Sequence, residues 1–95
     1  MQFLVLARDG TDPDASTRRQ KYREAHLANM TRLKAAGNYL IGGAILDDKG
    51  AMIGSAVIFE FPDRAALDET LANDPYMQGK VWQHVEVQPY RKAPV

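Results

Sequence analysis

The chain has 95 residues, no cysteine, and twelve basic side chains that balance twelve acidic ones, so its formal net charge is zero. This length predicts one domain, residues 1–95, with a core so modest that oligomerisation is an effective way to bury more apolar surface. The absence of cysteine excludes disulfides, thiolate metal sites and cysteine nucleophiles. The charges of both signs are interspersed, so we expect no nucleic-acid partner.

The first residues, from Met1 to Leu6, are apolar, but the run is too short for a signal-peptide core and no basic residues precede it. No segment approaches the roughly 20 apolar residues that span a bilayer. We therefore expect a cytoplasmic protein without a membrane partner.

Residues 3–7 are rich in valine, leucine and phenylalanine, and they predict a first strand. Residues 16–36 predict an amphipathic helix, with the side chain of Asp14 or Ser16 as its N-cap. Gly37 is expected to end that helix as a left-handed C-terminal cap.

Two apolar runs, residues 39–46 and 52–61, flank the turn sequence Asp47-Asp48-Lys49-Gly50 and predict a β-hairpin. A second helix is expected over residues 64–72, and Asn73-Asp74-Pro75 breaks it. A short turn over residues 76–80 then leads to a last strand, residues 82–90.

The resulting order, βαββαβ, is that of an α+β, ferredoxin-like sandwich with a four-stranded antiparallel sheet and two helices on one face. In residues 40–46 and 53–61, both alternating faces are largely apolar, whereas a sheet with one solvated face alternates apolar and polar residues. Because two helices cover only one face, we expect the other to meet a second copy of the sheet. The predicted assembly is a homodimer with a closed, barrel-like interface.

A histidine interrupts the apolar face of the long helix. His26 lies among Tyr22, Met30 and Leu33, at spacings of four, four and three residues. Burying an unpaired polar ring costs about 1–3 kcal/mol, so the imidazole must find a partner or line a cavity. A lone histidine on such a face is more often a hydrogen-bonded core residue than a catalyst.

Arginines accompany this histidine on the same helix. Arg23 lies about 60° from His26, and Arg19 lies near the apolar stripe one turn further back. One imidazole with one or two guanidinium groups can bind a carboxylate and move a proton near neutral pH.

Asp74 has two compatible interpretations. It precedes Pro75, which is typical of an N-cap and a first helical residue, so its carboxylate is expected to cap a short turn. The same carboxylate can orient and stabilise an imidazole, as the third member of a catalytic triad does. Capping leaves one oxygen free for that second role.

Glycines interrupt both strands of the hairpin. Gly42 and Gly43 either leave room for a ligand or admit large side chains from the helix, and Gly54 repeats the pattern. Ser55 is a candidate hydrogen-bond donor to a ligand, and no nucleophile elbow of the G-x-S-x-G type surrounds it.

The second histidine, His84, alternates with valines in the last predicted strand and is expected to face solvent or the rim of a dimer. His26 and His84 show no compact metal-ligand spacing, so we predict no metal site and no cofactor.

Five short motifs follow one another along nearly the whole chain: Arg23-Glu24-Ala25-His26-Leu27, Gly42-Gly43-Ala44-Ile45-Leu46-Asp47, Gly54-Ser55, Asn73-Asp74-Pro75-Tyr76 and Val85-Glu86-Val87-Gln88-Pro89-Tyr90. In this order they resemble the YCII-related (YciI-like) family. The resemblance implies a dimeric ferredoxin-like α+β barrel with a histidine and aspartate pair in a pocket. The family histidine falls on His26, its arginine on Arg23 and its aspartate on Asp74. Where the family commonly has G-P, this chain has Gly43-Ala44, which affects only the local strand shape.

The family that the chain resembles includes a branch similar to muconolactone dehalogenases. This resemblance, together with the residues described above, leads to our main hypothesis. We expect a small cofactor-independent enzyme in which His26 is general base or acid, oriented by Asp74, while Arg23, Ser55, Gly42 and Gly43 bind a small anionic ligand. The expected reaction is elimination, isomerisation or dehalogenation of a lactone or unsaturated acid. One alternative is a non-catalytic ligand-binding or interaction module. The other is a structural dimer in which the buried histidine forms a hydrogen bond within the core and has no further role.

Overall fold

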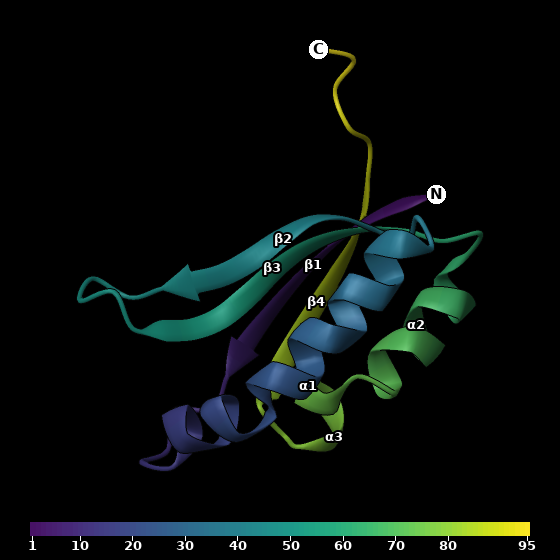
Figure 1. Ribbon diagram of the computed structural model, residues 1–95. Coiled ribbons are helices and arrows are strands. Elements are labelled where there is room, and N and C mark those ends of the chain that lie inside the picture. Colours follow the sequence, from purple (N-terminus) through teal and green to yellow (C-terminus); the bar gives the residue numbers. More distant parts are fainter.

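A four-stranded antiparallel sheet carries all the helices on one of its faces (Figure 1). The computed structural model describes all 95 residues. Its strands are β1 (Gln2–Asp9), β2 (Tyr39–Leu46), β3 (Met52–Glu60) and β4 (Trp82–Tyr90), and its helices are α1 (Ala15–Ala35), α2 (Arg64–Ala72) and α3 (Pro75–Gln78). The strand order is β2-β3-β1-β4, which confirms the predicted ferredoxin-like α+β sandwich.

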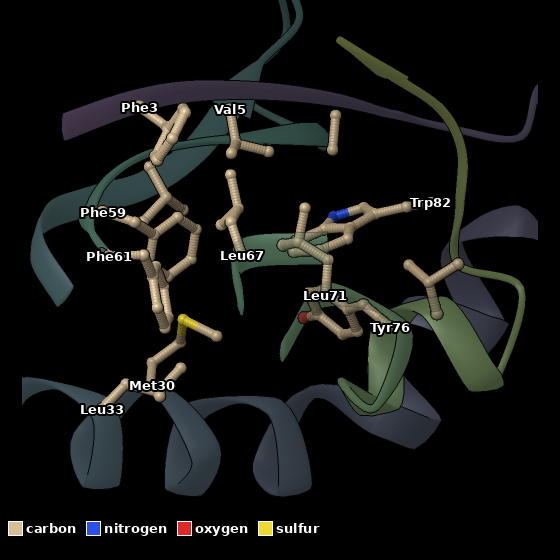
Figure 2. Packing of buried hydrophobic residues seen from close by; sticks show 13 residues of the cluster. Phe3, Val5, Met30, Leu33, Phe59, Phe61, Leu67, Leu71, Tyr76 and Trp82 are labelled. Carbon is tan, nitrogen blue, oxygen red and sulfur yellow. The ribbon is translucent and has the colours of Figure 1, made fainter. Parts of the chain in front are cut away.

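The core lies between the sheet and the helices (Figure 2). Side chains alternate across a strand, so every second residue of β1, namely Phe3, Val5 and Ala7, is buried against the helices. The buried apolar cluster has 13 members: Phe3, Val5, Ala7, Met30, Leu33, Val57, Phe59, Phe61, Leu67, Leu71, Tyr76, Val81 and Trp82. No helix is long and apolar enough to cross a membrane.

The region between α2 and β4 differs from the expectation. The predicted short turn, residues 76–80, lies partly in a one-turn helix, α3, whose first residue is Pro75, as the Asp-Pro pair indicates. Asp74 is its N-cap, and its side chain accepts a hydrogen bond of 2.8 Å from the backbone N–H of Tyr76. The predicted capping role of Asp74 is therefore confirmed.

Of the two residues predicted to cap α1, Asp14 occupies the N-cap position. Its side chain, however, makes no capping hydrogen bond. The Asp12 carboxylate organises this end of the helix instead, because it accepts hydrogen bonds of 2.8 and 2.7 Å from the Arg18 guanidinium. These bonds lower the pKa of Asp12 from 3.8 to about 2.

Gly37 ends α1 as predicted. Its φ is +84°, and its N–H donates to the carbonyl of Lys34 at 3.0 Å. The next N–H, of Asn38, donates to the carbonyl of Leu33 at 2.8 Å, which completes a Schellman motif.

We expect Gly37→Ala to lower the free energy of unfolding by about 1 kcal/mol, because a side chain at positive φ is strained although nothing lies near its Cβ. Gly37→Asn is the matched control, and it should cost less because asparagine tolerates this conformation. Urea unfolding of the three proteins measures the difference. Equal stability of the alanine variant and the parent would contradict the strain argument.

Candidate functional site

A cavity of about 130 Å³ lies between α1 and the β2–β3 hairpin. Of the residues predicted for the site, His26, Arg23, Ser55, Gly42 and Gly43 all line it. The rest of its wall is made of Arg19, Leu27, Met30, Tyr39, Ala44, Met52, Val57 and Tyr76. The structure thus brings together side chains from one helix, two strands and α3.

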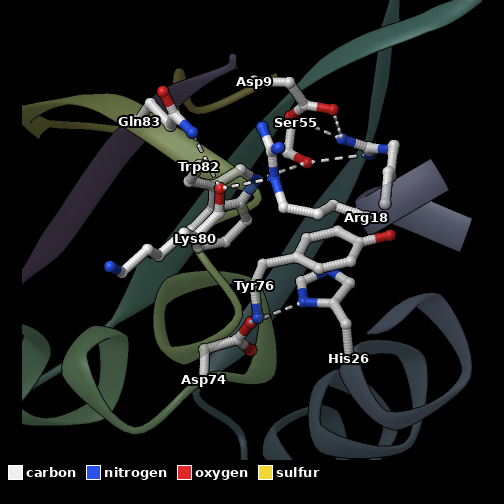
Figure 3. A network of polar contacts seen from close by, with 10 residues as sticks. Asp9, Arg18, His26, Ser55, Asp74, Tyr76, Lys80, Trp82 and Gln83 are labelled. Atoms are coloured by element: carbon white, nitrogen blue, oxygen red, sulfur yellow. Dashed lines mark hydrogen bonds and ion pairs between the residues drawn. The ribbon is translucent and has the colours of Figure 1, made fainter. Parts of the chain in front are cut away.

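Asp74 lies behind this wall and holds the imidazole. His26 and Asp74 are 6 % and 0 % exposed, and Nδ1 lies 2.8 Å from Oδ1 (Figure 3). The carboxylate also accepts hydrogen bonds from the Tyr76 N–H and from Asn29 Nδ2, each at 2.8 Å. Since a charged carboxylate only accepts hydrogen bonds, we assign the imidazole hydrogen to Nδ1.

The opposite nitrogen, Nε2 of His26, is then an acceptor with no hydrogen bond inside the chain. It is not sealed off, because the one fully buried side-chain nitrogen or oxygen without a partner is Arg19 Nε. Nε2 therefore retains some exposure, and His26 is one of the residues that line the cavity.

Aromatic contacts fix the plane of the imidazole. His26 stacks on Tyr76 with a centroid distance of 3.9 Å and an interplanar angle of 8°. Trp82 meets the same ring edge-on, at 5.4 Å and 78°. Burial raises the pKa of the Tyr76 phenol above its ordinary 10.0, and the charges of Arg19 and Arg23 oppose this rise only in part. The phenol is therefore neutral at physiological pH.

Arg19, which the sequence places near the apolar stripe but which was not among the residues expected to bind the ligand, lies two turns from His26 on one helix face. Arg19 is 4 % exposed, and its Nη1 bonds both oxygens of the buried Asp9 carboxylate, at 2.9 and 3.0 Å. Its Nη2 donates to Ser55 Oγ at 3.1 Å, and its guanidinium lies 4.9 Å from the centre of the Tyr76 ring.

Arg23 contrasts with Arg19. It is half-buried at the cavity wall and forms no ion pair within the chain. Its positive charge is therefore available to an anionic ligand, as predicted from its place on the helix.

The two glycines of β2 differ in their surroundings. A Cβ at Gly42 would lie 2.9 Å from both the carbonyl oxygen of Ala56 and Cγ2 of Val57. Nothing lies within 4 Å of a Cβ at Gly43. Gly42 thus permits close packing beside the cavity. At Gly43 a larger side chain would meet no neighbouring atom, so packing does not require glycine there.

His84 is exposed on β4, opposite Arg8 of β1, and does not line the cavity. No group of three or more histidine, aspartate or glutamate side chains is arranged to hold a metal ion.

Comparison with known proteins places the chain in a family. The model of the YCII-related domain matches residues 1–91. The chain belongs to the YCII-related family. It is 34% identical over 99 residues to protein YciI of Escherichia coli O6:H1, with 98% of this chain and 99% of that protein covered. An uncharacterized protein of Haemophilus influenzae is 32% identical over the same length and coverage.

Among solved structures, the chain is similar to 5-chloro-2-hydroxyhydroquinone dehydrochlorinase (TftG) from Burkholderia phenoliruptrix AC1100, in complex with 2,5-dihydroxybenzoquinone. The TM-score is 0.84 at 28% identity, over 98% of this chain and 96% of that one. A NIPSNAP domain protein from Burkholderia xenovorans has a TM-score of 0.54 at 20% identity, over 99% and 96%, and shares the fold alone.

We expect Gly42→Ala to lower the free energy of unfolding by about 1–3 kcal/mol, because the added methyl group meets a backbone carbonyl that cannot move away freely. Gly43→Ala is the matched control and should change it by less than about 0.5 kcal/mol. Chemical denaturation of both variants makes the comparison. If Gly42→Ala were as stable as its control, β2 would be able to shift and accommodate the methyl group, and the steric argument would be wrong.

Proposed function

We propose that this member of the YCII-related family is a small enzyme in which His26 moves a proton to or from a bound substrate. The observation that carries the proposal is that Nδ1 of His26 is held by the buried Asp74 carboxylate, which leaves Nε2 without a partner in the chain on a residue that lines the cavity. A base oriented in this way contributes about 10²- to 10⁴-fold in rate.

The cavity and its similarity to TftG support a small, oxygenated, unsaturated substrate. TftG is a dehydrochlorinase of a chlorinated hydroxyhydroquinone, and its structure contains 2,5-dihydroxybenzoquinone. The cavity of about 130 Å³ is close in size to a cavity of about 150 Å³ that admits benzene. Arg23 adds an unpaired positive charge, which favours a substrate with an anionic group.

Elimination is the reaction that this arrangement supports best. Nε2 of His26 takes a proton from the substrate, and the bonding electron pair forms a new double bond as halide or another leaving group departs with its own pair. The imidazolium that results is stabilised by Asp74 in a buried, low-dielectric environment. Isomerisation differs only in that the imidazolium returns the proton to another atom.

We expect His26→Gln to lower turnover of 5-chloro-2-hydroxyhydroquinone by at least about 10²-fold, because the amide cannot accept the proton. Chloride release measures the rate for the chlorinated hydroquinones of a substrate panel, and a change in ultraviolet absorbance on formation of the new double bond measures it for the lactones and unsaturated acids. His84→Gln, on the exposed side of β4, is the matched control and should retain the parent rate.

Parent-like turnover by a folded His26→Gln protein would refute the role of His26 in proton transfer. If the parent binds members of the panel and converts none of them, the ligand-binding module becomes the better description of the same cavity.

We further propose that the sheet face opposite the helices packs on that of a second copy. A shallow groove of about 360 Å³ on this face is lined mainly by apolar residues, with Leu4, Ile41 and Ile58 among them. Ile41, one of these strand residues, is 65 % exposed. Monomeric proteins rarely leave such a contiguous apolar patch in water.

Ile41→Glu should convert the expected dimer to a monomer, because a charge in the centre of an apolar interface would be desolvated without a partner. Gln20→Glu, exposed on α1 at the opposite face, should leave the dimer intact. Sedimentation velocity at micromolar concentration distinguishes the two states. A monomeric parent protein would refute the dimer.

A further inference from the structure

The amide of Asn29 completes the set of hydrogen-bond donors around the Asp74 carboxylate. Asp74 is 0 % exposed, so its oxygens depend on donors from the chain. Oδ1 accepts hydrogen bonds from His26 Nδ1 and from the Tyr76 N–H, and Oδ2 accepts one from Asn29 Nδ2, each at 2.8 Å. Asn29 is therefore the residue that satisfies the second oxygen of this buried charge.

Arg32 determines which way the Asn29 amide points. The guanidinium Nη2 of Arg32 donates to Asn29 Oδ1 at 2.6 Å. Because a guanidinium can only donate, the amide oxygen faces Arg32 and the amide NH₂ group faces Asp74. His26, Asn29 and Arg32 follow one another on α1 at intervals of three residues, so neighbouring members of this row share a helix face. The helix thus directs a row of donors toward one carboxylate.

A buried carboxylate needs such donors to remain charged. Removing one of them leaves part of the charge uncompensated, which costs more than the loss of a hydrogen bond between neutral groups. The imidazole of His26 depends on this charge in turn, because a carboxylate on Nδ1 stabilises the imidazolium that proton transfer creates. Asn29 itself does not line the cavity. Any effect of its amide on the reaction must therefore pass through Asp74.

We propose that Asn29 is a positioning residue for His26, whose amide holds the Asp74 carboxylate charged and in the orientation that binds Nδ1. The importance of this for turnover rests on the proposed function, whereas its effect on the Nδ1–H bond does not. An interaction that stabilises charge developing only during the reaction raises kcat and leaves substrate binding unchanged. Asn29 therefore belongs to the proton-transfer step without touching the substrate.

Asn29→Leu removes the amide and keeps a side chain of similar size. We expect the Nδ1–H proton of His26 to resonate further upfield and to exchange faster with water than in the parent, because its hydrogen bond to the carboxylate weakens. Proton NMR of the ¹⁵N-labelled protein measures both quantities, and the resonance is identified by its loss in His26→Gln. Gln20→Leu, the same exchange at an exposed position of α1, should change neither. A folded Asn29→Leu protein with the parent resonance and exchange rate would overturn the proposal.

In turnover of 5-chloro-2-hydroxyhydroquinone, Asn29→Leu should lower kcat by about ten-fold, the effect of losing one hydrogen bond to a charged group, and leave KM within about two-fold of the parent. Asn29→Gln keeps an amide donor and should recover part of the lost kcat. A raised KM with the parent kcat would show that Asn29 acts on substrate binding, and would contradict the positioning role.

Arg32→Leu provides a second route if Asn29→Leu fails to fold, because Arg32 is exposed. It leaves the Asn29 amide free to turn, so the Nδ1–H resonance should move upfield by a smaller amount. An unchanged resonance in this variant would contradict the claim that the row of donors holds the carboxylate. Parent-like turnover in His26→Gln, together with the expected NMR change in Asn29→Leu, would refute the proposed function and leave the positioning of His26 intact.

Discussion

The Asp74 carboxylate is the group on which the arrangement of the site depends. It is fully buried, and its oxygens accept hydrogen bonds from His26 and Asn29 on α1 and from the first turn of α3. Such a charge is tolerated without water only when donors surround it. One side chain thus joins the long helix to α3 and determines which imidazole nitrogen remains free.

A second buried ion pair, between Arg19 and Asp9, meets this network at the aromatic ring of Tyr76. His26 stacks on that ring, and the Arg19 guanidinium lies against it. Buried ion pairs contribute little net stability compared with apolar packing, so their main effect here is on geometry. They hold Ser55, His26 and the ring in one arrangement while the apolar core supplies the folding free energy.

Local signals made much of the fold predictable. The hairpin turn, the glycine that ends α1 and the Asp-Pro cap each act within a few residues, so their chemistry is visible in the sequence. The contacts at the start of α1 were harder to predict, because the Asp12 carboxylate there binds the side chain of Arg18, six positions away. β1 also extends beyond residues 3–7, to Gln2–Asp9, because strand ends depend on pairing partners in β3 and β4.

The sequence by itself determined the order of elements, the buried position of His26 and the motifs that indicate the family. The motifs also paired His26 with Asp74, but the tertiary structure alone decided that Asp74 meets Nδ1, and that Arg19 and Trp82 converge on Ser55 across 36 and 27 positions. The periodicity of a helix or strand indicates which face a side chain occupies. A hydrogen bond, however, requires the donor and acceptor atoms to approach within about 3 Å. That approach depends on how α1 and α3 pack on the sheet, which no local pattern encodes.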